Sequence, residues 1–442
     1  MIDYVKPTVL DLINCDERKQ AWDLIDFYYK HAKTLHDYDI LGYVSLKADK
    51  RDTYLACAEA AHSLARTPNE IYTSRINLYK AYNAMNYPEK ALFYIEQNLK
   101  LDPNDFETIA QKAFNISLAG DKETAEKILE DLSKKNPENS SKLEAAFSGK
   151  MLRSGKLAEG VRSFLETFKP KSGVFDETLR MKRWNGIIKP GTKLYIEGEG
   201  GIGDEIINIR FLDRLKKLGM DPILYSPGKY RKDSKSLFER HGYSIITDTY
   251  SIDPRCSWVP LMSLPFYLNL EEKDLWKGTY LTPLKQEKNR IQSDKFKIGI
   301  KCSGNPYFGQ DEYRKIPLEV MLEHLPKEAE IYYIDKEVGH PGTIDLGDRI
   351  ESWEDTLDFI DQMDCIVSSC TSLVHAAGAI GKTTFVAVPI AEYYIWTTSR
   401  RDDSSPWYGD NFHVMRQTKV RDWKEPLSEI HERVKMIMKN GE

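Results

Sequence analysis

The sequence has no long apolar segment and none of the common signatures of export. No stretch approaches the roughly 18 consecutive apolar residues that a membrane-spanning helix requires. The first residues, Met1 to Lys6, do not combine a basic region with the apolar run of a signal peptide. We therefore expect a cytoplasmic protein that has no membrane span.

Cysteine, histidine and basic residues do not occur in the patterns that would define a metal or nucleic-acid site. The six cysteines form no C-x-x-C pair, and no group of Cys and His residues has zinc-finger spacing. Thiols without such partners are typical of a reducing compartment. The net charge of −5 excludes the overall basic excess of a dedicated nucleic-acid-binding protein. A local basic cluster lies at 229–240, and we interpret it as a solvated helix face.

Before residue 175 the sequence contains an internal repeat of about 34 residues. This length is typical of helix–turn–helix units. Prolines mark the interval at Pro68, Pro103, Pro137 and Pro170. Polar breaks recur between them at Asn86, Gly120 and Gly155. A small residue follows each break, at Ala91, Ala125 and Gly160. Each unit therefore predicts a helix, a tight turn, a second helix and a proline-marked turn into the next unit.

The repeat predicts a helical solenoid over 1–175. Small residues let two antiparallel helices approach, and proline begins a helix well because its missing N–H needs no partner there. One helix pair cannot bury its apolar stripe alone, so neighbouring pairs must stack. The expected segments are a helix near 16–33, a faint unit at 34–68, and clear units at 69–103, 104–137 and 138–170. The segment from Tyr79 to Asp105 resembles a tetratricopeptide repeat.

Stacks of this type have a concave face that often holds peptides or partner domains. The alternative is that the solenoid only supports the remainder of the chain.

From about residue 190 the pattern changes to strands alternating with helices, which predicts largely parallel sheets covered on both faces. A first lobe, 188–283, has candidate strands at 193–197, 222–225, 244–247 and 258–261, with a helix at 205–218. A second lobe, 297–442, has candidate strands at 297–301, 330–334, 365–368 and 385–388. Its helices are expected at 318–324, 353–363 and 371–380. The polar segment 284–296 is interpreted as the linker between the lobes.

The first candidate site is a glycine-rich turn between a strand and a helix, formed by Gly200, Gly201 and Gly203 within 198–204. Such a turn lets a ligand approach backbone N–H groups at a helix start. The turn is not a G-x-G-x-x-G motif, and glycine is also used there for packing alone. Asp204 follows it and can point into a cleft as a general base. The alternative is a helix cap, which is worth about 1 kcal/mol.

The second candidate site follows the strand at 297–301. Ser303 and Asn305 stand at the strand end, and the adjacent cations Arg314 and Lys315 come shortly after. Arg can bind phosphate oxygens bidentately and Lys acts as a point charge, so the pair suits a diphosphate leaving group. No carboxylate arrangement in this lobe indicates a metal site. The alternative is a surface loop with two solvated cations.

The third candidate site is a hydroxyl-rich junction between the strand at 365–368 and the next helix. Thr371 and Ser372 begin that helix, whose first N–H groups can then hold phosphate. His375 follows one helical turn later and can face the same ligand. A lone helical His is also often packed or solvated.

In order and spacing these motifs resemble the tetratricopeptide-containing glycosyltransferases related to glycosyltransferase family 9, the bacterial heptosyltransferases, and more distantly the O-GlcNAc transferases. The resemblance spans essentially 34–425. Its matching stretches begin at Arg183, Glu199, Arg210, Leu261, Ser303, Arg314, Thr371 and Ser405.

The resemblance implies a GT-B fold, which is a pair of Rossmann-like lobes, and transfer of a sugar from a nucleotide-diphosphate donor with inversion at the anomeric carbon. It implies no metal and no cofactor beyond the nucleotide sugar. Asp204 would deprotonate the acceptor hydroxyl, Arg314 and Lys315 would stabilise the diphosphate, and the helix start from Thr371 to His375 would hold the donor. Many relatives have Asp where this chain has Cys370, and Gln where it has Gly200, which puts the donor's identity in doubt.

Two questions stay open at the level of sequence. The chain is either an active transferase or a non-catalytic repeat scaffold whose transferase lobes have decayed, an alternative that Cys370 motivates. The acceptor is a protein or peptide held along the solenoid groove, a saccharide, or hydroxymethylated phage-type DNA, and only the basic cluster at 229–240 supports the last of these.

Overall fold

A computed structural model describes the chain outside 1–3, 16, 169–171, 228–231, 306–310, 392, 398–402 and 441–442. The chain divides into two compact units. The first comprises Met1–Leu143 together with the short segments Asn305–Tyr313 and Thr418–Arg421. The second comprises Glu144–Gly304, Arg314–Gln417 and Asp422–Glu442.

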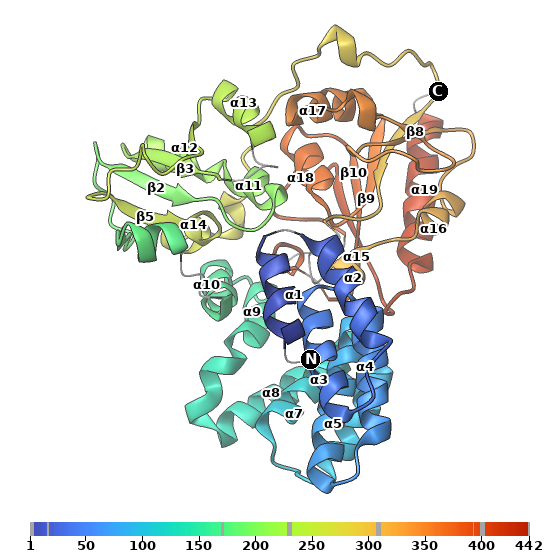
Figure 1. The fold of residues 1–442 in the computed structure, drawn as a ribbon. Coiled ribbons are helices and arrows are strands. Elements are labelled where there is room, and N and C mark those ends of the chain that lie inside the picture. The colour runs from blue at the N-terminus through green and yellow to red at the C-terminus, as the bar shows by residue number, and fades with distance from the viewer. Residues whose placement is uncertain are drawn as a thin grey trace. The chain divides into compact units, whose positions relative to one another are not determined.

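The first unit is an array of paired helices. They are α1 (Val5–Asn14), α2 (Arg18–Tyr29), α3 (Leu35–Lys47), α4 (Arg51–Leu64), α5 (Pro68–Ala84), α6 (Pro88–Leu99), α7 (Phe106–Leu118) and α8 (Lys122–Lys135), followed by the 3-10 helix η2 (Pro137–Leu143). From α3 onward each helix packs on the next one along the chain (Figure 1). The tetratricopeptide-like solenoid predicted from the 34-residue repeat is confirmed.

The turns of the array explain the repeat signals. Asn86 and Gly120 both adopt positive φ values, 59° and 104°, in the breaks that follow α5 and α7. Glycine and asparagine tolerate this left-handed conformation better than other residues. Pro68 stands in the first turn of α5, where Thr67 and Glu70 complete a capping box.

The second unit begins with the helix pair α9 (Glu144–Arg153) and α10 (Leu157–Phe168). Leu152, Leu157 and Val161 of this pair are buried in the same core as strand and helix residues of the first α/β lobe. The unit boundary at 143/144 therefore precedes the boundary at 175 that the sequence suggested, because the last helix pair buries its apolar face against the α/β part.

The first sheet has five parallel strands in the order β1-β5-β2-β3-β4. The strands are β1 (Lys182–Arg183), β2 (Lys193–Glu197), β3 (Asp221–Tyr225), β4 (Ser244–Ile246) and β5 (Ser257–Pro260). Its helices are α11 (Ile202–Asn208), α12 (Phe211–Lys217), α13 (Lys232–Arg240) and α14 (Leu264–Tyr267) (Figure 1). Alternate residues of β2 face opposite cores: Leu194 packs with the α11 and α12 side, whereas Tyr195 packs with Phe175 of the π-helix η3 (Gly173–Thr178).

The second sheet has six parallel strands in the order β11-β10-β9-β6-β7-β8. The strands are β6 (Lys297–Lys301), β7 (Glu330–Tyr333), β8 (Ile344–Asp345), β9 (Cys365–Ser369), β10 (Thr384–Val388) and β11 (Phe412–Arg416). The helices are α15 (Asp311–Arg314), α16 (Leu318–Glu323), α17 (Trp353–Gln362), α18 (Ser372–Ala379) and α19 (Lys424–Asn440). Short 3-10 helices complete the unit: η4 (Leu261–Ser263), η5 (Glu272–Asp274), η6 (Glu287–Asn289), η7 (Gly347–Arg349) and η8 (Tyr394–Trp396).

Helices cover both faces of this second sheet. Ile366 of β9 shares a core with α17 and α18, whereas its neighbour Val367 shares one with α16 and α19. The strand alternation predicted two such lobes, and the fold class is confirmed: a helical repeat followed by a pair of Rossmann-like lobes. The helix expected at 205–218 is instead interrupted at 209–210, and the two-residue strands β1 and β8, the strand β11 and the helix α19 were not predicted.

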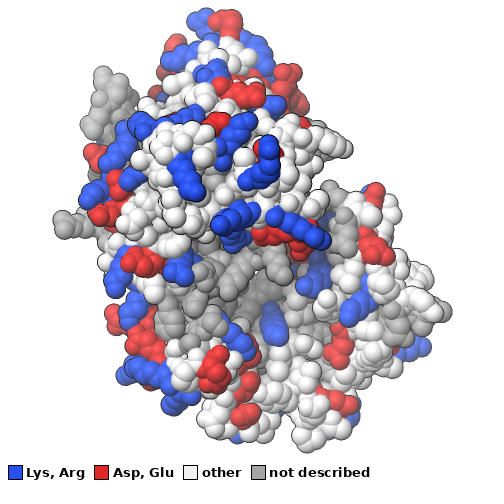
Figure 2. Space-filling model, turned by 90° about the vertical axis from the view of Figure 1, so that its left-hand side faces the viewer, with Lys and Arg blue, Asp and Glu red and all other residues white. Residues whose placement is uncertain are grey.

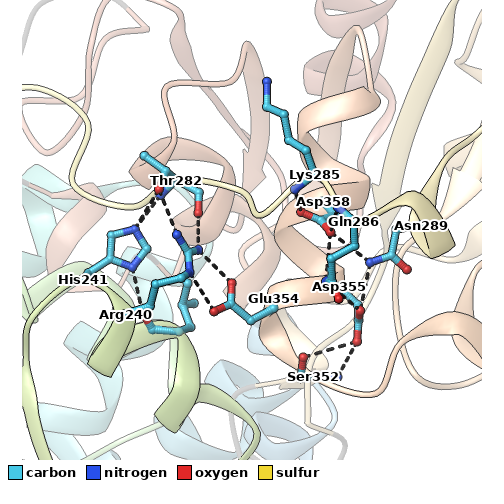
Figure 3. Close-up of polar contacts among 11 residues, drawn as sticks. Arg240, His241, Thr282, Lys285, Gln286, Asn289, Ser352, Glu354, Asp355 and Asp358 are labelled. Carbon is cyan, nitrogen blue, oxygen red and sulfur yellow. Dashed lines mark hydrogen bonds and ion pairs between the residues drawn. The ribbon is translucent and has the colours of Figure 1, made fainter.

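The segment between the lobes is anchored to α17. Lys285 and Gln286 donate backbone N–H groups to the two oxygens of Asp358, at 2.6 and 2.9 Å (Figure 3). Arg240 at the end of α13 binds both oxygens of Glu354, at 3.0 and 2.8 Å. Charge-assisted bonds of this kind are roughly twice as strong as neutral ones. The polar linker predicted at 284–296 is therefore ordered where it meets α17.

Every described helix falls short of the combined length and apolar character that a membrane crossing requires.

We predict that Gly160→Ala destabilises the second unit by about 1–3 kcal/mol, because overpacking of a tight helix contact forces its neighbours apart. A methyl group at this position would lie 2.6 Å from Leu152 Cγ and 3.1 Å from the Leu152 backbone nitrogen. Urea unfolding monitored by circular dichroism measures the change. Gly149→Ala in the partner helix is the matched control, since its methyl group would meet only the flexible Arg153 guanidinium. Equal losses in the two variants would contradict the packing argument.

Candidate functional site

Asp204 stands in the first turn of α11, after the glycine-rich turn that the sequence singled out. Gly200 has a φ of 70°, and a side chain there would lie 2.4 Å from Asp204 Oδ2. The turn thus needs glycine both for its backbone conformation and for the approach of the carboxylate. The Gly201 N–H donates to Asp204 Oδ2 at 2.7 Å. Asp204 therefore caps its helix, which was the alternative interpretation of this residue.

The second oxygen of Asp204 has a partner from the other lobe. Tyr393, between β10 and η8, donates its hydroxyl to Asp204 Oδ1 at 3.1 Å. Tyr393 was not predicted from the sequence. One signal was available: the residue follows the carboxyl end of a parallel strand, the edge at which such sheets bind ligands.

The helices α11 and α18 cross closely at Gly203. A Cβ atom on Gly203 would lie 2.8 Å from His375 Cδ2 and 3.3 Å from Ser372 Cα. Only a residue without a side chain allows this approach. The crossing brings the first and third candidate sites together, because Asp204 follows Gly203 directly and Ser372 begins α18.

Arg314 of the second candidate site also lies at the start of α18. Arg314 donates from Nη1 to the carbonyl oxygen of Cys370 at 2.9 Å, one residue before Thr371. Lys315 is exposed and Ser303 is half-buried. Asn305 groups with the first compact unit, so the structure does not place it with the others.

The start of α18 fits an anion in part. Thr371 occupies the N-cap position but its side chain makes no capping hydrogen bond. Its hydroxyl lies instead 3.1 Å from Ser368 Oγ. The N-terminal end of a helix attracts negative charge, and here the Arg314 guanidinium adds a full positive charge nearby.

His375 is packed into an aromatic layer. It is buried, its Nδ1 lies 2.6 Å from the Tyr408 hydroxyl, and its ring stacks on Trp396 at 5.6 Å. Burial, reinforced by the charges of Arg210 and Arg314, lowers the pKa of His375 to about 3. The imidazole is therefore neutral at physiological pH. This is the packed histidine of the alternative interpretation, and contact between His375 and a ligand stays a prediction.

Cys370, at the position where many relatives of the resembled family have Asp, is also buried. The Trp396 indole N–H donates to its sulfur at 2.8 Å. Burial raises the pKa of the Cys370 thiol, while the Arg314 charge opposes the rise. The thiol is thus a neutral group that packs beneath the start of α18.

A second carboxylate, Glu199, lies beside Asp204 and was also not singled out from the sequence. The Met262 N–H donates to Glu199 Oε1 at 3.0 Å. Burial raises the pKa of Glu199 to about 7; the Met262 donor opposes this, and the negative charges of Glu197 and Asp204 add to it. A carboxyl group that titrates near neutrality beside another carboxylate is typical of functional sites.

Arg210 is enclosed by aromatic rings behind the site. Its guanidinium carbon lies 4.9 Å from the Tyr280 ring centre, and 5.7 and 5.6 Å from those of Trp407 and Tyr408. One nitrogen donates to the Trp407 carbonyl at 2.8 Å. Cation–π contacts offset part of the cost of burying this charge.

The basic cluster at 229–240 gives little support to binding of DNA. Lys229 and Arg231 lie outside the described residues. Lys235 pairs with Glu239 at 3.6 Å, and Arg240 pairs with Glu354. Over the face shown in Figure 2, basic and acidic side chains are interspersed. Lys235 and Arg240 are therefore neutralised locally, as residues on a solvated helix face would be.

No model of a known protein family matches the chain, and no curated protein matches its sequence. Solved structures do resemble it. The O-GlcNAc transferase of Thermobaculum terrenum covers 99% of this chain and is itself covered over 93%, with 12% identity and a TM-score of 0.41.

Two heptosyltransferase structures resemble part of the chain. ADP-heptose heptosyltransferase II of E. coli has 9% identity, a TM-score of 0.33, and coverage of 56% of this chain and 99% of its own. The iron-containing heptosyltransferase TibC, solved with ADP-D-β-D-heptose, has 10% identity and a TM-score of 0.38. The match covers 59% of this chain and 78% of the TibC chain. At such low identities, an activity for this chain has to be argued from its own residues.

We predict that Glu199→Gln removes a pH dependence of stability that the natural chain shows. A carboxyl group whose pKa rises from about 4.3 in the unfolded chain to about 7 stabilises the fold at low pH. That contribution is lost as the pH rises through 7. The free energy of unfolding of the natural chain should therefore fall, relative to Glu199→Gln, between pH 5 and pH 7.5.

Urea unfolding across this pH range measures the difference. Glu328→Gln, which changes an exposed carboxylate of the same unit, should follow the natural chain. Parallel curves for the natural chain and Glu199→Gln would contradict the assignment.

Proposed function

We propose that the chain is a metal-independent, inverting glycosyltransferase that moves a sugar from a nucleotide-diphosphate donor to an acceptor hydroxyl. The observation that carries this proposal is the Gly203 crossing. It sets one carboxylate, Asp204, beside a helix start flanked by the Arg314 guanidinium. A base and an anion site in such proximity are what sugar transfer from a diphosphate needs.

In the proposed reaction Asp204 is the general base. Its Oδ2 accepts a hydrogen bond from the Gly201 N–H, and its Oδ1 accepts one from the Tyr393 hydroxyl. The acceptor hydroxyl gives its proton to Asp204 while its oxygen forms a bond to the anomeric carbon. The bond from that carbon to the diphosphate oxygen breaks on the opposite side, so the configuration inverts. General-base catalysis of this kind contributes about 10²–10⁴-fold in rate.

The departing diphosphate is assigned to Arg314, Lys315 and the first N–H groups of α18. Arg314 is held by the Cys370 carbonyl, which fixes one edge of its guanidinium. Lys315 is exposed and can follow the phosphate as a point charge. His375, with its low pKa, supplies no positive charge. Positioned cations of this kind can stabilise charge that develops on a leaving group.

For the acceptor we propose a protein or peptide. Within the first unit, α5 and α7 line a hollow of about 340 Å³ with Tyr72, Ile76, Tyr79, Lys80, Asp105, Glu107 and Gln111. Aromatic rings beside acidic, basic and amide groups suit a polypeptide, which presents apolar and polar groups in alternation.

We predict that Asp204→Asn lowers the rate of sugar transfer, or of nucleotide-sugar hydrolysis, by at least about 100-fold. The amide keeps an oxygen for the Gly201 N–H but cannot take a proton from the acceptor. Turnover of UDP-, GDP- and ADP-sugars, followed by release of the nucleotide in the presence of a metal chelator, tests the assignment.

Equal rates for Asp204→Asn and the natural chain would end the assignment of the base. If neither chain turns over a nucleotide sugar and neither binds a nucleotide diphosphate, the alternative of a non-catalytic scaffold is supported.

We predict that one of UDP, GDP and ADP raises the melting temperature of the chain, because a ligand of the native state stabilises it by mass action. At a ligand concentration of 100 Kd the gain is about 2.7 kcal/mol. Arg314→Met should reduce this gain by removing a phosphate contact. Arg255→Met is the control, since Arg255 is 88% exposed and pairs with Asp253. The same gain in Arg314→Met and Arg255→Met would contradict the proposed anion site.

A further inference from the structure

We infer that Tyr393 is the positioning residue of the proposed base: its hydroxyl orients the Asp204 carboxylate and keeps it available to accept a proton. This inference rests on the proposed function. It adds a residue from the second lobe to a base that the first lobe supplies.

The geometry restrains both oxygens of the carboxylate. Gly201 N–H binds Oδ2 at 2.7 Å and Tyr393 O–H binds Oδ1 at 3.1 Å. A carboxylate held by one donor can still turn about its Cβ–Cγ bond. With a donor on each oxygen, that rotation costs a charge-assisted hydrogen bond.

Tyr393 is itself held firmly enough to serve as a support. The Phe164 ring of α10 meets it edge-on at 5.7 Å and 84°. The ring centre of the next residue, Tyr394, lies 4.7 Å from that of Tyr393. The hydroxyl also lies 3.8 Å from the sulfur of Met262. Contacts from both lobes and from α10 therefore determine where the hydroxyl lies.

The charges around Asp204 give the hydroxyl a second role. Glu199, in the turn before α11, places negative charge on one side when it is ionised, above about pH 7. Cys370 after β9 and Tyr394 of η8 are neutral groups, and the Arg314 guanidinium of α15 supplies positive charge near Cys370. A neighbouring carboxylate favours protonation of Asp204, which would disable the base. A hydrogen-bond donor favours the ionised form and opposes that effect.

Tyr393 remains such a donor over the working pH range. Burial, followed by the negative charge of Asp204, raises the pKa of the Tyr393 phenol well above its ordinary value. The phenol therefore keeps its proton, and the hydrogen bond between the two residues keeps its direction. A lysine or arginine would also favour the ionised carboxylate, but it would weaken the base by direct ion pairing.

The test is Tyr393→Phe, which removes only the hydroxyl. We expect a fall in kcat of roughly 10-fold with little change in the KM for the nucleotide sugar. The nucleotide sugar is assigned to Arg314, Lys315 and the start of α18, and Tyr393 is not part of that site. The acid limb of the pH–rate profile should move up by about one pH unit, because the ionised Asp204 carboxylate has lost a hydrogen-bond donor.

Tyr195→Phe is the matched control. Tyr195 is a buried tyrosine of β2 whose hydroxyl bonds to Ser251 O and Asp253 N, at 3.2 and 3.0 Å. This variant should lose comparable stability and keep the acid limb of the natural chain. A Tyr393→Phe profile that coincides with the natural one would overturn the inference, as would a sugar found attached to Tyr393 by intact-protein mass spectrometry.

A double-mutant cycle on stability separates this inference from the proposed function. Unfolding of Tyr393→Phe, Asp204→Asn and the double variant is compared at pH 5 and pH 8. We expect Tyr393→Phe to be more destabilising when Asp204 is present than in the Asp204→Asn background. Absence of this coupling would overturn the inference even in a chain with no transferase activity. Coupling in a chain with no activity would instead contradict the proposed function alone.

Discussion

The site depends on one close contact, the crossing of α11 over the start of α18 at Gly203. A single methyl group there would meet His375 Cδ2 at 2.8 Å and the Ser372 backbone at 3.3 Å. Closely packed interiors cannot absorb such a group without moving an element. Because Asp204 directly follows Gly203 and Thr371 directly precedes Ser372, the crossing fixes the distance between a carboxylate of one lobe and a helix start of the other. His375 completes the contact as a neutral, stacked ring, which explains why a titratable residue stands in a dry layer.

Charge around this crossing is divided between two sides. Glu197, Glu199 and Asp204 gather on the side of the first lobe, and Arg314 stands with the uncapped start of α18 on the other. A hydroxyl that loses a proton needs a negative neighbour, whereas a diphosphate that leaves needs positive ones. The arrangement gives each partner of a sugar transfer an environment of the appropriate sign. Burial, together with the negative charges of Glu197 and Asp204, raises the pKa of Glu199 to about 7, so this carboxyl group holds its proton up to about that pH.

How much of this structure the sequence predicts depends on how far apart along the chain the interacting residues lie. The helical array is signalled locally, since Asn86 and Gly120 each set a turn within their own unit. The buried strands are signalled by short apolar runs, and edge strands such as β8, which consists of Ile344 and Asp345, are too short to give a pattern. Asp204 was found because a glycine-rich turn precedes it. Tyr393 and Glu199 were missed because their roles come from contacts between elements far apart in the chain, 189 positions in the case of Tyr393 and Asp204.

Residue type alone leaves open whether Asp204 is a cap or a base; the folded chain shows the cap, and the cap is compatible with the proposed role as a base. Capping uses Oδ2, which accepts the Gly201 N–H, and leaves Oδ1 directed toward the other lobe. A carboxylate that caps its own helix is anchored to the backbone, so its second oxygen is better placed than that of a carboxylate on a mobile side chain. The helix end also favours the ionised form that a base requires. In the proposed reaction this cap would hold the base in place, and Gly200, whose missing side chain lets the carboxylate turn back onto the loop, makes the cap possible.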